Sequence, residues 1–152
     1  MTKPYILGFY GKSNAGKTTL VVDLIKRLTN EGFKVATIKR SDKEISIDNP
    51  GKDTFRHTWA GAELTVLSSR NETDFIIKKS LEMIDIIEFI SKIDYYEFIF
   101  IEGASDRAIP KIRIGDITKR ENTVFDYDND FEKLYNLVKN QEIKGEIKKW
   151  AI

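Results

Sequence analysis

Residues 5–18 read Tyr-Ile-Leu-Gly-Phe-Tyr-Gly-Lys-Ser-Asn-Ala-Gly-Lys-Thr, a short apolar run followed by a glycine-rich segment. Apolar residues then recur at helical spacing from Leu20 to Leu28. The segment from Gly11 to Thr18 matches the full G-x-x-x-x-G-K-[ST] pattern, and it lies between a predicted strand and a predicted helix. This order predicts a loop that binds the phosphates of a nucleotide.

The chemistry of such a loop explains its residue types. Small residues let backbone N–H groups turn toward the phosphates, and the start of the following helix adds partial positive charge. Lys17 is expected to reach the outer phosphates, and the Thr18 hydroxyl is expected to ligate Mg²⁺. The predicted nucleotide-binding residues are Gly11, Lys12, Ser13, Asn14, Ala15, Gly16, Lys17, Thr18 and Thr19.

A carboxylate follows the most apolar run of the chain. Residues 98–101 read Phe-Ile-Phe-Ile, and Glu102 comes directly after them, before Gly103. An acidic residue at the end of a buried strand beside the phosphate loop commonly holds the water shell of the magnesium ion. We therefore expect Glu102 to be a metal-site residue, and the strands before Gly11 and Glu102 to be neighbours in the sheet.

Strand-like and helix-like segments alternate along the rest of the chain, which predicts an α/β fold with a mainly parallel sheet and helices on both faces. Together with the loop, this is the fold of a P-loop NTPase, in one domain over residues 1–152. The run 111–114 alternates polar and apolar residues, as in a strand with one face in water. Further strands are expected at 35–38, 64–67 and 75–77, and helices near 53–59, 83–90, 131–138 and through Ile143, Ile147 and Trp150.

Composition excludes several classes of protein. The 152 residues include no cysteine, so disulfides and thiolate metal sites are impossible. The net charge of +1 gives no basic excess of the kind that nucleic-acid-binding proteins show. The apolar runs are far shorter than the ~20 residues that cross a bilayer, and the first residues show no signal-peptide pattern. We expect a soluble cytoplasmic protein that binds neither nucleic acid nor membrane.

A second motif gives a more specific indication. Residues 48–57 read Asp-Asn-Pro-Gly-Lys-Asp-Thr-Phe-Arg-His, and Ile101-Glu102-Gly103 and Pro110-Lys111-Ile112 follow in order. With the loop, these segments resemble the molybdopterin-guanine dinucleotide biosynthesis protein B (MobB) family over roughly residues 5–114. Members of that family typically carry histidines between the positions of Lys39 and Asp48. Residues 40–47 contain none here, so contacts made by those histidines are not expected.

The resemblance implies a GTP-binding accessory protein in the biosynthesis of the molybdenum cofactor molybdopterin guanine dinucleotide. Such a protein binds GTP with Mg²⁺, hydrolyses it weakly and assists the guanylyltransferase of the pathway. The implied partners are that transferase, molybdopterin or a molybdoenzyme, and a second copy of the chain in a homodimer.

Three residues outside the loop are further candidates. Asp48, presented from the turn at Pro50 and Gly51, is a possible third residue of the metal site. Lys39 ends the second predicted strand at the carboxyl edge of the sheet, where wound α/β folds bind ligands. Asp53 is a candidate site residue, and either Asp53 or Thr54 could equally be the N-cap of the helix that begins there.

Other functions use the same loop. A small-molecule kinase would employ Thr18 and Glu102 unchanged, although no arginine-rich lid is evident. Lys12 occupies the position of an additional lysine in dimeric ATPase switches. Thr118-Lys119-Arg120-Glu121 resembles, loosely, the segment with which GTPases recognise guanine.

Overall fold

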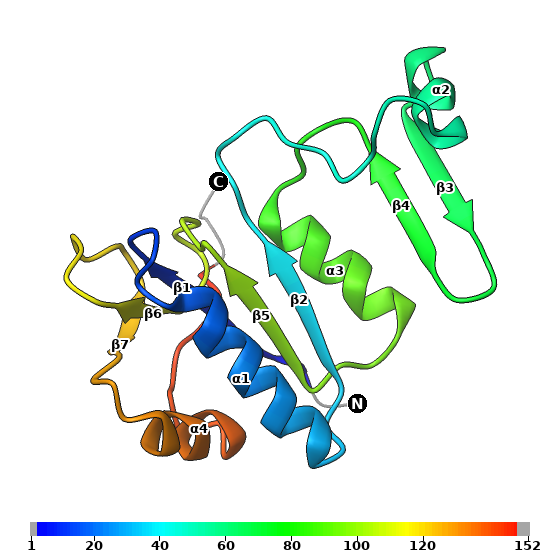
Figure 1. Cartoon of the computed structure of the whole chain (residues 1–152). Helices are drawn as coiled ribbons and strands as arrows, with labels where there is room; N and C mark the ends of the chain where they lie inside the picture. The colour runs from blue at the N-terminus through cyan, green and yellow to red at the C-terminus, as the bar shows by residue number, and fades with distance from the viewer. Residues whose placement is uncertain (1–2, 149–152) are drawn as a thin grey trace. The chain divides into compact units, whose positions relative to one another are not determined.

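The two apolar runs before Gly11 and Glu102 are adjacent strands at the centre of the fold. In the computed structural model, which describes residues 3–148, five strands form one sheet in the order β2-β5-β1-β6-β7 (Figure 1). The elements are β1 (Tyr5–Gly11), α1 (Lys17–Asn30), β2 (Val35–Lys39), α2 (Asp53–Trp59), β3 (Leu64–Ser68), β4 (Thr73–Ile77), α3 (Met83–Ile93), β5 (Phe98–Glu102), β6 (Lys111–Ile114), β7 (Thr123–Asp126) and α4 (Phe131–Lys139).

Every neighbouring pair in the central sheet is parallel. Phe9 of β1 lies opposite Glu102 of β5, and Lys39 of β2 lies opposite the same glutamate on the other side. This register brings the carboxyl ends of three strands to one edge of the sheet. The α/β fold with a parallel sheet is confirmed, as is the predicted pairing of the strands before Gly11 and Glu102.

The chain forms two compact units, which we describe separately. One consists of residues 3–40 and 87–148, and the other is Ser41–Ile86. The boundary falls within α3. One domain over residues 1–152 stays a prediction.

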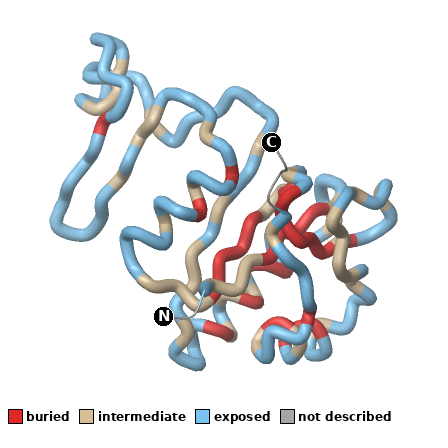
Figure 2. The backbone as a smooth tube through the Cα atoms, turned by 180° about the vertical axis from the view of Figure 1, so that it is seen from behind, coloured by how far each residue is buried: buried red, intermediate tan, exposed pale blue. Residues whose placement is uncertain are grey.

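Apolar packing is concentrated in the first unit. Central strands β1 and β5 are buried on both faces over four consecutive residues each. Helices α1 and α4 lie beside each other on one face of the sheet (Figure 1). Helix α1 contributes four buried side chains whose spacing matches the predicted stripe: Leu20, Val21, Leu24 and Leu28. The buried residues in Figure 2 accordingly cluster around this sheet.

The second unit has little core of its own. Its elements are α2 and the antiparallel hairpin of β3 and β4. Within Ser41–Ile86, all of which the structure describes, only Thr65 and Met83 are buried. The hydroxyls of Thr58 and Thr65 lie 3.3 Å apart, which joins the helix to the hairpin by a polar contact.

The end of the chain differs from the expectation in two ways: one strand was not predicted, and the expected terminal helix is wrong. Strand β7 was not predicted, because its four residues lie among asparagines and aspartates and show no alternation. Residues 140–148, the described part of the expected terminal helix, contain no helix, and Trp150 lies outside the described residues.

The expectation that one face of β6 is exposed to water is also wrong. This strand pairs with β1 on one side and with β7 on the other, so it is an interior strand. Lys111 is completely buried, and its ammonium group donates to the carbonyl oxygens of Ile109 at 2.8 Å and Glu121 at 2.7 Å. The alternation of residues 111–114 therefore reflects a buried lysine whose polar end is satisfied by backbone carbonyls.

The buried lysine predicts a pH dependence of stability. Burial lowers the pKa of Lys111 to about 8, below its ordinary value of 10.5. The unfolded chain holds this proton to higher pH than the folded protein does, so the free energy of unfolding should rise with pH above 8. From about pH 8 to about pH 9.5 we expect a gain on the order of 1 kcal/mol in urea unfolding, absent in Lys111→Met.

Two tyrosines set the highest pH at which this experiment can be interpreted. Burial is the chief cause that raises the pKa values of Tyr5 and Tyr135 to about 12. Their contribution to the free energy of unfolding is therefore lost only at pH values above their ordinary pKa of 10.0. If the free energy of unfolding changed with pH in the same way for the wild type and Lys111→Met between about pH 8 and about pH 9.5, the lowered pKa of Lys111 would be contradicted.

Candidate functional site

The predicted phosphate loop leaves β1 through a tight turn. The N–H of Ala15 donates to the carbonyl of Lys12 at 3.1 Å. Asn14 and Gly16 both have positive φ, 66° and 82°. Glycine suits position 16 because residues with a side chain rarely adopt a positive φ.

Glycine is needed at position 11, the first position of the loop, for a different reason. A Cβ atom on Gly11 would lie 2.6 Å from the carbonyl oxygen of Ile114 in the adjacent strand. Gly11 therefore permits the close approach of β1 and β6 at the point where the loop begins.

Helix α1 begins without a protein cap. Its N-cap position is Gly16, no side chain among residues 3–148 accepts a capping hydrogen bond there, and its first four residues carry no carboxylate. Helix α4 shows the ordinary arrangement, because Asp130 accepts from the N–H of Lys133 at 3.1 Å. The first N–H groups of an uncapped helix need acceptors from elsewhere, and anions satisfy them well.

Three predicted residues meet beside this helix start. Glu102 Oε1 accepts a hydrogen bond from Thr18 Oγ1 at 2.5 Å and another from Lys39 Nζ at 3.0 Å. They come from the ends of β5, α1 and β2, which the parallel register brings together. The prediction that Lys39 ends its strand at the carboxyl edge is confirmed.

The surrounding cations keep Glu102 ionised. Partial burial is the largest single influence and raises its pKa, but the hydrogen bonds from Thr18 and Lys39, with the charges of Lys39 and Lys17, together outweigh it. The net effect lowers the pKa of Glu102. The carboxylate is therefore charged at neutral pH.

The backbone around Glu102 is fixed on both sides. Its carbonyl accepts from the N–H of Arg40 at 2.9 Å, and the N–H of Gly103 donates to the carbonyl of Phe9, also at 2.9 Å. Gly103 has a φ of 82°, and a Cβ atom there would lie 2.5 Å from the carbonyl oxygen of Arg40. The tightness of this turn holds Glu102 in place.

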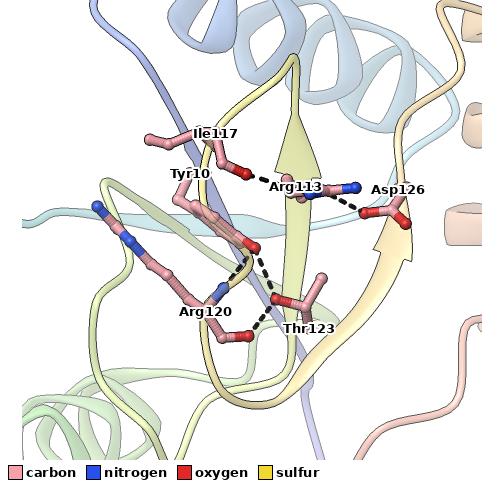
Figure 3. A network of polar contacts seen from close by, with 6 residues as sticks. All are labelled: Tyr10, Arg113, Ile117, Arg120, Thr123 and Asp126. Carbon is pink, nitrogen blue, oxygen red and sulfur yellow. Dashed lines mark hydrogen bonds and ion pairs between the residues drawn. The ribbon is translucent and has the colours of Figure 1, made fainter.

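A polar network anchors the end of β1 on the side of β6 and β7. Figure 3 shows the Tyr10 hydroxyl between the backbone N–H of Arg120, at 3.0 Å, and Thr123 Oγ1, at 2.7 Å. The Arg120 guanidinium lies 4.8 Å from the centre of the Tyr10 ring and donates to the carbonyl of Ala104 at 2.7 Å. Sequence patterns gave no sign of this network, which supports the strand just before the loop.

The segment that loosely resembles a guanine-recognition motif, residues 118–121, takes part in this network through Arg120. The carboxylate of the next residue, Glu121, forms an ion pair with Arg107 at 3.3 Å. These contacts give Arg120 and Glu121 a structural role, and base recognition by residues 118–121 stays a prediction.

Asp48 and Asp53 lie in the second unit. Asp48 Oδ1 accepts a hydrogen bond from Thr54 Oγ1 at 3.0 Å, which ties the Pro50-Gly51 turn to α2. The expectation of Asp53 as an N-cap is wrong, because α2 starts at Asp53 itself and Lys52 takes the cap position. A role of Asp48 or Asp53 at the metal or ligand site stays a prediction.

The donor set at the sheet edge suits Mg²⁺. A hydroxyl and an ionised carboxylate in contact are hard oxygen donors of the kind that this ion prefers, and it usually keeps several waters. Within residues 3–148, no group of three or more histidine, cysteine, aspartate or glutamate side chains could hold a metal ion. A magnesium ion here would therefore depend on the nucleotide phosphates and water for its remaining ligands.

Comparison with known proteins assigns the family. A family model described as molybdopterin guanine dinucleotide synthesis protein B (MobB) matches residues 6–139. The chain belongs to the MobB family. It departs from the typical MobB sequence in residues 40–47, which contain no histidine.

Curated MobB relatives carry the name of adapter proteins. A putative molybdopterin-guanine dinucleotide biosynthesis adapter protein of Methanocaldococcus jannaschii is 33% identical over 112 residues, covering 70% of this chain and 45% of the relative. The adapter protein of Escherichia coli is 31% identical over 110 residues, covering 70% and 63%. The chain thus matches less than two thirds of the length of these relatives.

Solved MobB structures share the fold. The crystal structure of Bacillus subtilis MobB aligns with a TM-score of 0.73 at 22% identity, over 93% of this chain and 99% of that one. A MobB homologue from Bacillus stearothermophilus aligns with a TM-score of 0.60 at 15% identity, over 90% and 99%.

Proposed function

We propose that this protein binds GTP with Mg²⁺ and serves as an accessory protein in the biosynthesis of molybdopterin guanine dinucleotide. The observation that carries the proposal is the uncapped start of α1, with Thr18 and Glu102 in contact beside it. The names of the relatives, which are adapter proteins of that pathway, support the assignment of the pathway.

Each part of the site has a task in this function. The N–H groups of the loop and of the first turn of α1 would donate to phosphate oxygens, and Lys17 would contact the outer phosphates. Thr18 would ligate Mg²⁺ and Glu102 would orient its water. The bound ion would neutralise phosphate charge. The sequence contains no motif that identifies a base for the attacking water or an arginine finger, so hydrolysis should be slow.

The partners follow from the same assignment. An accessory role requires contact with the guanylyltransferase and with molybdopterin or a molybdoenzyme, and we include a homodimer and a cytoplasmic location in the proposal. Within residues 3–148, no helix has the length and apolar character that crossing a bilayer requires.

Calorimetry with magnesium tests the proposal directly. We expect GTP to bind more tightly than ATP, and molybdopterin to co-purify with the protein. Turnover without partners should stay below about 1 s⁻¹, the low edge of typical enzyme rates. Transfer of phosphate from GTP or ATP to a small acceptor would instead establish the kinase alternative.

A further inference from the structure

Lys39 and Thr18 share one carboxylate oxygen. Both donate to Glu102 Oε1, at 3.0 Å and 2.5 Å. A threonine whose oxygen ligates Mg²⁺ can still donate its proton to a carboxylate, so the Thr18 contact is compatible with the bound ion. The ammonium of Lys39 is different, because it places a positive charge against the oxygen that would face the hydrated ion.

We propose that Lys39 is a tethered counter-ion of the magnesium site. Its ammonium neutralises Glu102 while Mg²⁺ is absent, and it releases Glu102 to the hydrated ion when Mg²⁺ arrives. The inference rests on the proposed nucleotide binding, and it makes Lys39 a residue that sets how strongly the affinity for nucleotide depends on magnesium.

The two partners differ in their freedom to move. Lys39 is the last residue of β2, and its side chain is 61% exposed. The Glu102 side chain is only 14% exposed. The backbone of Glu102 is held by Arg40, and that of the following Gly103 by Phe9. The flexible four-carbon stem of a lysine can change partner at little cost, because an exposed ion pair contributes little to stability. Lys39 is therefore the partner that moves.

Electrostatics gives opposite effects with and without the metal ion. Without Mg²⁺, the charge of Glu102 repels a triphosphate, and the Lys39 ammonium masks that repulsion. With Mg²⁺, the ammonium repels the ion and competes with it for Glu102. Removal of the Lys39 charge should therefore weaken magnesium-free binding and increase the gain in affinity that magnesium provides.

Calorimetric titration of Lys39→Met with GTP and with ATP, in EDTA and in saturating Mg²⁺, tests this directly. The measured quantity is the ratio of the two dissociation constants, EDTA over magnesium, for whichever nucleotide binds more tightly. We expect the ratio to increase about twofold to fivefold over the wild type, as the loss of one partly exposed ion pair implies. Lys39→Arg, which keeps the charge, should restore a ratio near the wild-type value.

Lys34 offers a matched control at the opposite end of β2. It also pairs with a carboxylate, that of Asp94, and both side chains are about half exposed, at 49% and 51%. Lys34→Met should leave the ratio unchanged. An unchanged ratio in Lys39→Met, with nucleotide still bound by the wild type, would overturn the role of Lys39 alone. Failure of the wild type to bind either nucleotide would overturn the proposed function, and the role of Lys39 with it.

Discussion

We expect Lys17→Ala to abolish GTP binding and to leave the nucleotide-free protein folded. Lys17 follows Gly16 at the start of α1, and its charge helps to lower the pKa of Glu102. Loss of a charged contact to the outer phosphates should reduce affinity by about a hundredfold or more. A partly buried lysine at the start of a helix, with its charge near the surface, contributes little to folding, so the thermal midpoint should change by less than about 2 °C. Calorimetry with Mg²⁺ and a thermal melt of each protein measure the two effects.

The neighbouring loop lysine is the control for this variant. Lys12 is exposed and its carbonyl closes the turn with Ala15, so Lys12→Ala keeps the backbone contact. Because the contribution that we predict from Lys12 to the phosphate loop is its backbone, we expect Lys12→Ala to bind GTP almost as well as the wild type. Retained GTP affinity in Lys17→Ala would remove Lys17 from the site. Nucleotide-dependent dimerisation that is lost in Lys12→Ala would favour the dimeric ATPase switch.

Local sequence predicted the strand, turn and helix of residues 5–30 well, because their constraints are local. The spacing from Gly11 to Thr18 requires only one turn between one strand and one helix. Glu102 could be placed beside Thr18 because it ends the most apolar run, and parallel strands align their carboxyl ends. The reason for Gly11 could not be predicted, since it depends on the carbonyl of Ile114, a hundred positions along the chain.

The features that sequence reasoning missed depend on tertiary neighbours. Lys111 was interpreted as solvent-exposed, but the carbonyls that accept from its ammonium lie in loops on either side of β6. The hydroxyl of Tyr10 likewise finds its partners in Arg120 and Thr123. Alternation along a strand reports which side chains share a face, but it does not report whether that face is covered.

The turn that follows Glu102 leaves no room for a side chain. Gly103→Ala would place a Cβ atom 2.5 Å from the carbonyl oxygen of Arg40, at a φ of 82° that alanine rarely adopts. The obstacle is backbone at the end of β2, so relief requires the ends of β2 and β5 to separate. We expect a loss of about 3 kcal/mol in the free energy of unfolding, which corresponds to about 6–12 °C in the thermal midpoint.

Gly32→Ala separates the two causes of this loss. Gly32 also has a positive φ, 91°, but a Cβ atom there would meet no atom of the described residues within 4 Å. That variant should lose only about 1 kcal/mol, the cost of the backbone conformation alone. Because the clash at Gly103 displaces the residues next to Lys39 and Glu102, Gly103→Ala should also bind GTP with Mg²⁺ more weakly below its melting range, and Gly32→Ala should not. Equal stability of the two variants would show that the approach of Arg40 to Gly103 does not constrain this turn.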